Sequence, residues 1–224
     1  VIKKLFIRRK NKPSWLILYL YMIIKRLILG PLATNTYYLE IDGEVLIIDP
    51  ASKSKKLFDL LEGKKVLGVL LTHGHFDHIR GVDELYKEFH MPILLHEEDI
   101  FLATDEDLYQ ENMKMFGVSG KITSPITSIQ EGIKKIGPFE FEIYHTPGHT
   151  MGSVLYRFND DLFTGDTLFK EGVGRTDLVG GSNRLLKDSL HFIKSLDPKL
   201  IIHPGHDEES TLSHEFMYNI YLRP

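Results

Sequence analysis

The chain has 224 residues, no cysteine and a formal net charge of −4 at neutral pH. This length suits one large domain or two small ones, and no low-complexity, repeated or linker-like stretch divides the chain. Because cysteine is absent, we exclude a disulfide framework and a thiolate metal site, so a bound metal needs nitrogen and oxygen ligands. The composition therefore predicts one domain and suits the reducing cytoplasm.

The first 21 residues differ in composition from the rest. They carry six lysines and arginines and no acidic residue, and an apolar run follows from Trp15 to Ile24. The remaining residues have a balance of about −10, and such an anionic body argues against a nucleic-acid partner. Ten apolar residues cannot span a bilayer, and no small-residue cleavage site follows them. We interpret 1–21 as an N-terminal extension, either an upstream-start artefact or a membrane-surface tether, and 22–224 as the domain.

The first half of the domain alternates short strands with helices. Tyr37–Ile41 and Val45–Ile48 flank the turn pair Asp42-Gly43 and predict a hairpin. The apolar run from Val66 to Leu71 predicts a buried strand. Further elements are expected at Lys53–Leu61 (helix), Ile79–Phe89 (helix), Pro92–Leu95 (strand) and Glu97–Phe116 (two acidic helices that separate near Thr104).

Strand-like runs follow in the second half of the chain. They are rich in β-branched and aromatic residues and are bounded by turn residues, so we expect a second sheet. Its expected strands are Ile133–Ile136, Phe139–Tyr144, Val154–Phe158 and Asp161–Phe163. A helix at Arg184–Leu196, a strand at Leu200–Ile202 and a closing helix at Ser213–Tyr221 complete the expected elements.

Four motifs place metal-binding side chains beside glycine-rich turns. Thr72-His73-Gly74-His75-Phe76-Asp77-His78 holds three imidazoles and a carboxylate within seven residues, a density that a folded core does not require. The others are Thr146-Pro147-Gly148-His149-Thr150, Thr164-Gly165-Asp166-Thr167 and His203-Pro204-Gly205-His206. A single Pro-Gly-His is usually only a turn, but each of these four sets follows an expected strand. Side chains at strand ends can converge at one rim of a rigid core, so the motifs predict one preorganised site.

With these motifs the chain resembles the metallo-β-lactamase superfamily, and within it most closely the short glyoxalase II-like hydrolases. The resemblance extends from Met22 onward and includes Asn35-Thr36-Tyr37, Ile48-Asp49-Pro50, Gly148-His149-Thr150-Met151-Gly152-Ser153, Gly165-Asp166-Thr167-Leu168-Phe169 and Gly174-Arg175-Thr176-Asp177. It implies an α/β fold, the αββα sandwich of this superfamily, with two sheets inside and helices outside. The same scaffold hosts many chemistries, so the resemblance is less specific for one activity.

The resemblance also implies how the ligands divide between two metal ions. One ion would be bound by His73, His75 and His149, the other by Asp77, His78 and His206, and Asp166 would bridge the pair. Three protein ligands and a bridge leave a coordination position open for water. We expect two divalent ions, with zinc favoured, although iron or manganese accepts the same ligand types.

By the same resemblance, the expected activity is thioester hydrolysis on a small-molecule substrate. A metal-bridging hydroxide would attack the acyl carbon, so no protein nucleophile is needed. A thioester of the S-2-hydroxyacyl type, such as S-lactoylglutathione, suits this chemistry because a thiolate leaves without strong acid catalysis. Asp77 and Asp166 are the expected catalytic carboxylates, since both would bind metal and Asp77 could also orient or protonate. The oligomeric state stays open.

The expected substrate-binding residues depart from the full-length glyoxalase II pattern. Those enzymes carry a lysine and an aromatic residue after the bridging aspartate and add a helical C-terminal domain. Here Arg175 and Asp177 replace that pair, and only 18 residues follow His206. Arg175 is expected either to meet a substrate carboxylate or to form an internal ion pair with Asp177. The sequence therefore does not single out glutathione as the thiol.

Two other functions stay open. One is a mononuclear iron persulfide dioxygenase, whose family shares Gly-Arg-Thr-Asp and whose ligands match His73, His149 and Asp166. Its tyrosine after the C-terminal His-Asp is Glu208 here, which argues against it. The other is a non-catalytic metal-binding protein, against which the complete ligand set argues. The remaining histidines are expected in surface or structural roles, with two of them beside the ligand turns: His90, His96, His145, His191, His203 and His214.

Overall fold

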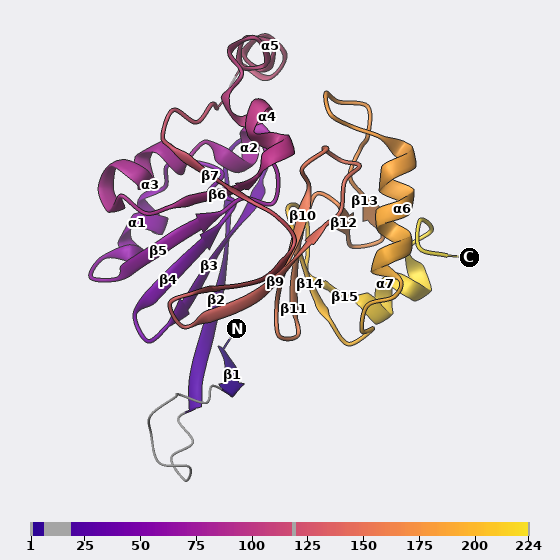
Figure 1. The fold of residues 1–224 in the computed structure, drawn as a ribbon, viewed down its shortest axis with the longest axis horizontal. Helices are drawn as coiled ribbons and strands as arrows, with labels where there is room; N and C mark the ends of the chain where they lie inside the picture. Colours follow the sequence, from indigo (N-terminus) through magenta and orange to yellow (C-terminus); the bar gives the residue numbers. More distant parts are fainter. Residues whose placement is uncertain (1, 7–18, 118–119, 224) are drawn as a thin grey trace.

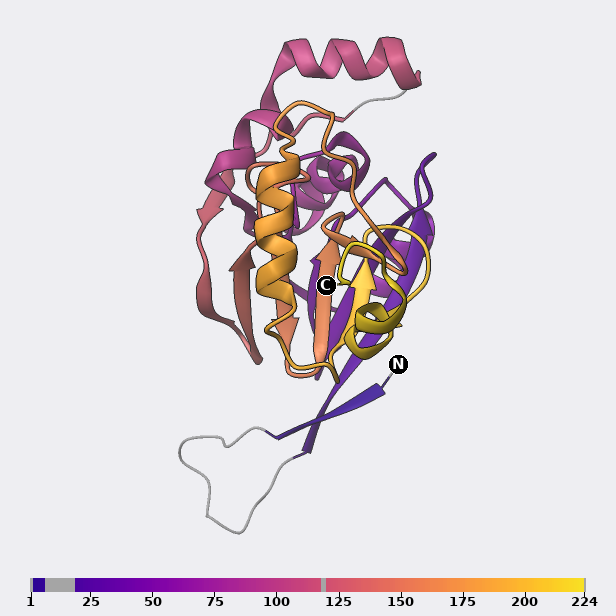
Figure 2. The same ribbon diagram turned by 90° about the vertical axis from the view of Figure 1, so that its right-hand side faces the viewer.

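Two β-sheets pack face to face and carry helices on their outer faces (Figure 1). The computed structural model describes residues 2–6, 19–117 and 120–223, and within these ranges the first sheet has seven strands and the second has six. Figure 2 shows the second sheet from the side covered by α6 (Asn183–Ile193) and α7 (Leu212–Tyr218). The expected αββα sandwich is confirmed.

The first sheet runs in the order β1-β2-β3-β4-β5-β6-β7. Its strands are β1 (Ile2–Phe6), β2 (Tyr19–Leu29), β3 (Thr34–Ile41), β4 (Glu44–Ile48), β5 (Lys65–Leu70), β6 (Ile93–His96) and β7 (Ile126–Ile129). The first four strands pair antiparallel, and the last four pair parallel. Parallel neighbours need a crossover, which α1 (Lys55–Leu61) and α3 (Val82–Phe89) provide for β4-β5 and β5-β6.

The second sheet runs in the order β15-β14-β11-β10-β9-β8. Its strands are β8 (Gly132–Ile136), β9 (Phe139–His145), β10 (Val154–Phe158), β11 (Asp161–Gly165), β14 (Ile201–Pro204) and β15 (Ser210–Thr211). The pair β11-β14 is parallel, with α6 in the crossover. A small hairpin of β12 (Leu168–Phe169) and β13 (Gly172–Val173) follows β11.

The core forms three apolar layers, because each sheet buries both of its faces. Between the sheets, alternate residues of β9, Phe139, Phe141 and Ile143, point inward and are at most 2% exposed. Burial of such a side chain contributes about 2 kcal/mol. The outer face of the first sheet packs against α1 and α3, and that of the second packs against α6 and α7. This packing holds the strand ends in fixed positions.

Most expected elements are present, with shifted ends. The β3-β4 hairpin is confirmed, and it turns through Asp42 and Gly43, both with positive φ as a primed turn requires. The expected acidic helices are α4 (Ile100–Thr104) and α5 (Glu106–Phe116), which follow a short 3₁₀ turn at Glu97–Asp99. The closing helix ends at Tyr218 rather than Tyr221.

The prediction of one continuous helix over Ile79–Phe89 was wrong. The chain forms a single turn, α2 (Phe76–Ile79), and then restarts as α3 at Val82. Gly81 lies between them because a Cβ there would stand 2.8 Å from the carbonyl oxygens of Pro50 and Ser52. The two-residue strands β12, β13 and β15 are too short for their pattern to predict them, and β7 was also not predicted.

The N-terminal apolar run is described only in part. Residues 19–24 lie in β2, which agrees with its expected continuation into the first strand, whereas 15–18 lie outside the described residues. Ile2–Phe6 also pairs with β2, which the sequence did not predict. In the described part of the chain, no helix combines the length and apolar character needed to cross a bilayer.

Candidate metal centre

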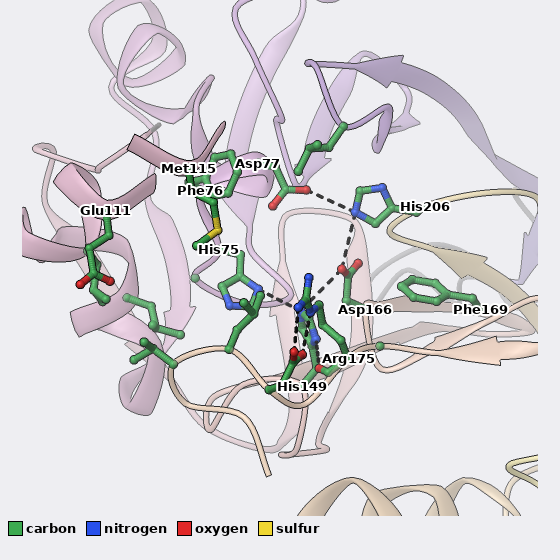
Figure 3. A pocket seen from close by; sticks show the side chains of 18 residues that line it. His75, Phe76, Asp77, Glu111, Met115, His149, Asp166, Phe169, Arg175 and His206 are labelled. Atoms are coloured by element: carbon green, nitrogen blue, oxygen red, sulfur yellow. Dashed lines mark hydrogen bonds and ion pairs between the residues drawn. The ribbon is translucent and has the colours of Figure 1, made fainter. Parts of the chain in front are cut away.

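All seven expected metal ligands lie together at one rim of the sandwich. They come from the segment that follows β5 and enters α2, from the β9-β10 loop, and from the ends of β11 and β14. Figure 3 shows five of these side chains, those of His75, Asp77, His149, Asp166 and His206, around the floor of a pocket. In chain order the seven are His73, His75, Asp77, His78, His149, Asp166 and His206. The sequence motifs therefore predicted which side chains the fold would bring together.

The first cluster contains three histidines. The ligand atoms of His73, His75 and His149 all lie within 4.8 Å of one another. Nδ1 of His75 stands 2.9 Å from Nε2 of His149, and the ring of His73 lies edge-on to both. Three imidazole nitrogens this close can bind one metal ion from one side, as in tetrahedral sites with an open position.

The second cluster contains Asp77, His78 and His206, also within 4.8 Å. Oδ2 of Asp77 lies 3.2 Å from Nε2 of His206. Asp166 reaches both clusters: its Oδ2 is 3.5 Å from Nε2 of His149 and 3.5 Å from Nε2 of His206. Its position between the clusters is the geometry that a bridging carboxylate needs.

Unpaired buried atoms show that this site fits metal ions. Nε2 of His73, Nε2 of His78 and Oδ1 of Asp166 are buried and have no hydrogen-bond partner among the described residues. Nε2 of His78 and Oδ1 of Asp166 lie 3.3 Å apart, but their geometry is not that of a hydrogen bond. A buried polar atom without a partner costs about 1–3 kcal/mol, and coordination to a metal would offset that cost. The donor set is nitrogen and oxygen, which suits zinc, iron or manganese.

Electrostatics in the site also favour bound cations. Burial lowers the pKa of His73, and burial together with His149 lowers the pKa of His75 to about 3, so both imidazoles are neutral at pH 7. Burial disfavours charge on His78, but Asp77 and Asp166 outweigh it and raise its pKa. Burial also opposes charge on Asp77 and Asp166, but His78 lowers the pKa of both. Two ionised carboxylates at the floor therefore attract positive charge.

Asp49 orients the second cluster, a role that the sequence did not assign. Its Oδ2 lies 2.9 Å from Nδ1 of His78 and accepts a 2.6 Å hydrogen bond from the Thr72 hydroxyl, while Oδ1 accepts from the Thr72 backbone. The carboxylate holds the His78 ring so that Nε2 faces the site. Asp49 is 1% exposed, and its place directly after the apolar run Val45–Ile48 was a signal that the sequence offered.

Asp99 fixes the other ligand loops and was also missed. Its carboxylate accepts hydrogen bonds from the backbone of Gly74 and Gly152 and from the hydroxyl of Thr150, at 2.6–2.8 Å. These bonds tie the His73–His75 segment to the loop that carries His149. In sequence Asp99 belongs to an acidic run that looks like a solvent-facing helix, and no local pattern distinguishes it.

Strand β3 anchors the loop that carries His206. The Asn35 side chain donates to the carbonyl oxygens of Pro204 and Asp207, and the Tyr37 hydroxyl donates to Pro204. Thr34 donates to Oδ2 of Asp77 at 2.8 Å. A Cβ at Gly205 would overlap the Asp166 carboxylate, so glycine lets this loop approach the site. The early motif Asn35-Thr36-Tyr37 thus holds the last ligand.

In this structure Arg175 forms the internal ion pair that was one of its two expected roles. It forms a bidentate ion pair with Asp177, at 2.7 Å for both bonds, and both side chains are more than half exposed. Its backbone oxygen lies 2.8 Å from Nδ1 of His149 and so orients that ligand. Arg175 also lines the pocket, so contact with a substrate stays a prediction.

The other histidines lie outside the seven-ligand site. His145 contacts the Met151 carbonyl at 2.8 Å and stabilises the ligand turn, and its ring stacks on His96. Together with Glu98 these two form a further group with potential ligand atoms within 4.8 Å. His203 lies 2.6 Å from Asp161 in the second sheet. His90 and His191 are exposed, at the end of α3 and on α6, and the half-buried His214 on α7 pairs with Glu171 at 2.9 Å.

The pocket above the ligands has a volume of about 520 Å³, within the range of small-molecule sites. Five of the seven ligands reach its surface: His75, Asp77, His149, Asp166 and His206. The remaining two, His73 and His78, lie at most 1% exposed below them. A small substrate could therefore reach metal ions bound by these ligands, while the protein would cover the inner side of those ions.

Comparison with known proteins agrees with this geometry. The model of the metallo-β-lactamase superfamily matches residues 29–206. A probable metallo-hydrolase of Bacillus subtilis, YqgX, is 35% identical over 204 residues, which cover 88% of this chain and 96% of the relative.

Two solved structures are also similar. The BLEG-1 B3 metallo-β-lactamase is 34% identical with a TM-score of 0.83, covering 90% of this chain and 100% of that chain. TTHA1623 in a di-iron-bound form is 34% identical with a TM-score of 0.80, covering 88% and 100%. The chain belongs to the metallo-β-lactamase superfamily, whose fold and clustered histidine and aspartate ligands it carries.

Proposed function

We propose that this protein is a binuclear metal-dependent hydrolase that cleaves acyl thioesters. The observation that carries the proposal is the position of Asp166 between two complete ligand clusters at the floor of an open pocket. His73, His75 and His149 would hold one ion, Asp77, His78 and His206 the other, and Asp166 would bridge them. Zinc is the favoured metal, and iron is the alternative because TTHA1623 has a di-iron-bound form.

When bound, two divalent ions lower the pKa of a water and polarise a carbonyl group. The residues supply the rest. Asp49 and the Arg175 carbonyl fix the rings of His78 and His149, and Thr34 fixes the Asp77 carboxylate. Hydrolysis forms a bond from the water oxygen to the acyl carbon and breaks the carbon–sulfur bond. The products are a carboxylic acid and a thiol, and no redox partner is required.

Two other reactions are alternatives to thioester hydrolysis as the function of this site. The BLEG-1 relative makes β-lactam hydrolysis the first of them, since an amide-like carbonyl would meet the same ions. The mononuclear iron dioxygenase is the second, because Gly174-Arg175-Thr176-Asp177 fits its pattern. The complete second cluster of Asp77, His78 and His206 favours a binuclear hydrolase over a single-iron enzyme.

A panel of substrates tests the proposal on protein loaded with zinc or with iron. S-lactoylglutathione, neutral N-acetylcysteamine thioesters, the β-lactam nitrocefin and glutathione persulfide would be assayed side by side. We expect thiol release from thioesters, with nitrocefin turnover at least about a hundredfold slower. Oxygen consumption with persulfide and no thiol release, or β-lactam turnover above thioester turnover, would contradict the proposal.

A further inference from the structure

The outer wall of the pocket differs chemically from its floor. Beyond the ligands, large apolar side chains form most of it: Leu32, Phe76, Leu102, Leu108, Met115, Phe169, Leu178 and Val179. They come from the β2-β3 turn, from α2, α4 and α5, from β12 and from the segment after β13. The wall therefore continues from the metal centre out to solvent.

Helix α5 supplies one face of this wall. Leu108, Glu111 and Met115 are spaced by three and four residues, so they share one side of the helix, and all three line the pocket. Figure 3 shows Met115 and Glu111 on the side of the pocket away from Asp166. Met115 is 69% exposed, and Val179 is 49% exposed. Apolar side chains that line a cavity and still meet water are available to a ligand.

The charges of the outer wall are the second observation. Arg175 is the one lysine or arginine among the described residues that line the pocket, and Asp177 already pairs with it through two bonds. Glu111 adds a carboxylate without a balancing cation in the lining. An anionic substrate such as a glutathione or coenzyme A thioester would find no free cation there. A neutral apolar substrate needs no such cation and would not be repelled by Glu111.

We propose that the pocket selects uncharged thioesters whose apolar acyl group lies against the wall formed by α5 and residues 178–179. The inference rests on the proposed function and names its substrate class. Glu111 then acts as a specificity residue that disfavours anionic substrates. Met115 and Val179 act as apolar contacts that improve with each methylene of the acyl chain.

A chain-length series on the zinc-loaded enzyme is the first test. N-acetylcysteamine thioesters of acetate, butyrate, hexanoate and octanoate share one neutral thiol and differ only in the acyl group. Burial of a methylene predicts that kcat/KM rises about threefold per added CH₂, mainly through KM. Equal kcat/KM across the series would overturn the inference, while thiol release from every member would leave the proposed function standing.

A binding assay separates the inference from activity. The neutral fluorophore N-phenyl-1-naphthylamine should bind the holoenzyme, and octanamide should displace it. Met115→Gln should weaken binding of the fluorophore about threefold to tenfold, because it adds a polar group at the wall. Met217→Gln is the matched control, since Met217 is 60% exposed on α7 and does not line the pocket. Equal binding by wild type and Met115→Gln would overturn the inference.

Charge reversal tests the role of Glu111. Glu111→Lys should raise kcat/KM for S-octanoylglutathione about threefold to tenfold through KM, and leave the N-acetylcysteamine thioester of octanoate within about twofold. Glu88→Lys makes the same charge change at an exposed position of α3 outside the pocket and serves as the control. Identical effects of both variants would show that only net charge matters and would overturn the assignment of Glu111.

These outcomes distinguish the two proposals. Displaceable fluorophore binding without hydrolysis of any thioester would reject the thioester activity and support the apolar ligand class. Hydrolysis with no chain-length dependence and no fluorophore binding would reject the ligand class and support the activity.

Discussion

The floor and the outer wall of the pocket are built in opposite ways. At the floor, His73 and His78 are at most 1% exposed, and buried carboxylates orient the ligand segments through hydrogen bonds of 2.6–2.9 Å. At the wall, Met115 is mostly exposed and the Arg175–Asp177 pair meets solvent. The difference teaches that the fold fixes the positions of the candidate metal ligands, whereas the side chains of the outer wall can change without disturbing those positions.

The largest effect is expected from Asp166, which touches both clusters. Asp166→Ala should lower kcat by more than about a thousandfold, because the proposed bridge between the two ions is lost. The fold should persist, as measured by circular dichroism. His191→Ala, at an exposed position of α6, is the control and should leave kcat unchanged. An active Asp166→Ala variant with full metal content would show that Asp166 does not bridge the two ions.

The buried pair His203–Asp161 joins the two strands that carry Asp166 and His206, and it predicts a pH-dependent stability. Burial opposes charge on His203, but its hydrogen bonds to Asp161 and Glu209 raise its pKa. The folded-state pKa therefore lies above the unfolded value of about 6.5. The contribution of the pair is complete below that value and is lost as the pH rises through the folded-state pKa.

His203→Gln should therefore destabilise the zinc-loaded protein by about 3 kcal/mol at pH 6 and by less at pH 8.5. Urea unfolding of both proteins at the two pH values measures this difference. A loss that is equal at both values, or larger at pH 8.5, would show that His203 is not charged in the fold.

Substitution of Asp49 tests whether its buried carboxylate raises the affinity of the second cluster for metal. Asp49→Asn keeps the shape and the positive φ of the residue but removes the charge behind His78. Affinity for the second zinc ion should fall about tenfold to a hundredfold, with the first ion retained. Competition with a chelator of known affinity measures both steps. Unchanged affinity for the second ion would mean that His78 is oriented without this carboxylate.

The smallest effect is expected at the end of the sandwich away from α5. There β1 pairs with β2, and both views place β1 at the opposite end of the molecule from α5 (Figures 1 and 2). A chain that starts at Met22 retains the buried Met22 and Ile24 and all seven ligands. Its kcat/KM and metal content should stay within about twofold of the full chain. A larger loss of kcat/KM or of metal content would show that residues 1–21 contribute to activity or metal binding.

The sequence was sufficient to predict which candidate ligands converge, because they are concentrated in short motifs after apolar strands. Rigid sheets then bring those strand ends to one rim, so His78 and His206 lie in one cluster although 128 positions separate them. It was insufficient for Asp99, whose neighbours Glu97 and Glu98 suggest a surface helix although its own side chain is fully buried. Residues that act through backbone contacts between distant loops leave no local periodicity.

The outer wall of the pocket could also not be predicted from the sequence. Leu108 and Met115 form an ordinary amphipathic pattern, and only the position of α5 over the pocket gives them a role. The break between α2 and α3 has a similar cause, because Gly81 meets the backbone of Pro50 and Ser52 across the sheet end. Both features depend on tertiary contacts, which override local helix propensity.

Metal stoichiometry tests the central claim most directly. Protein purified after growth in metal-replete medium would be exchanged into chelator-free buffer and measured by elemental analysis. The two clusters joined by Asp166 predict two metal ions per chain. A ceiling of one ion per chain, with Asp77, His78 and His206 unliganded, would contradict the binuclear centre.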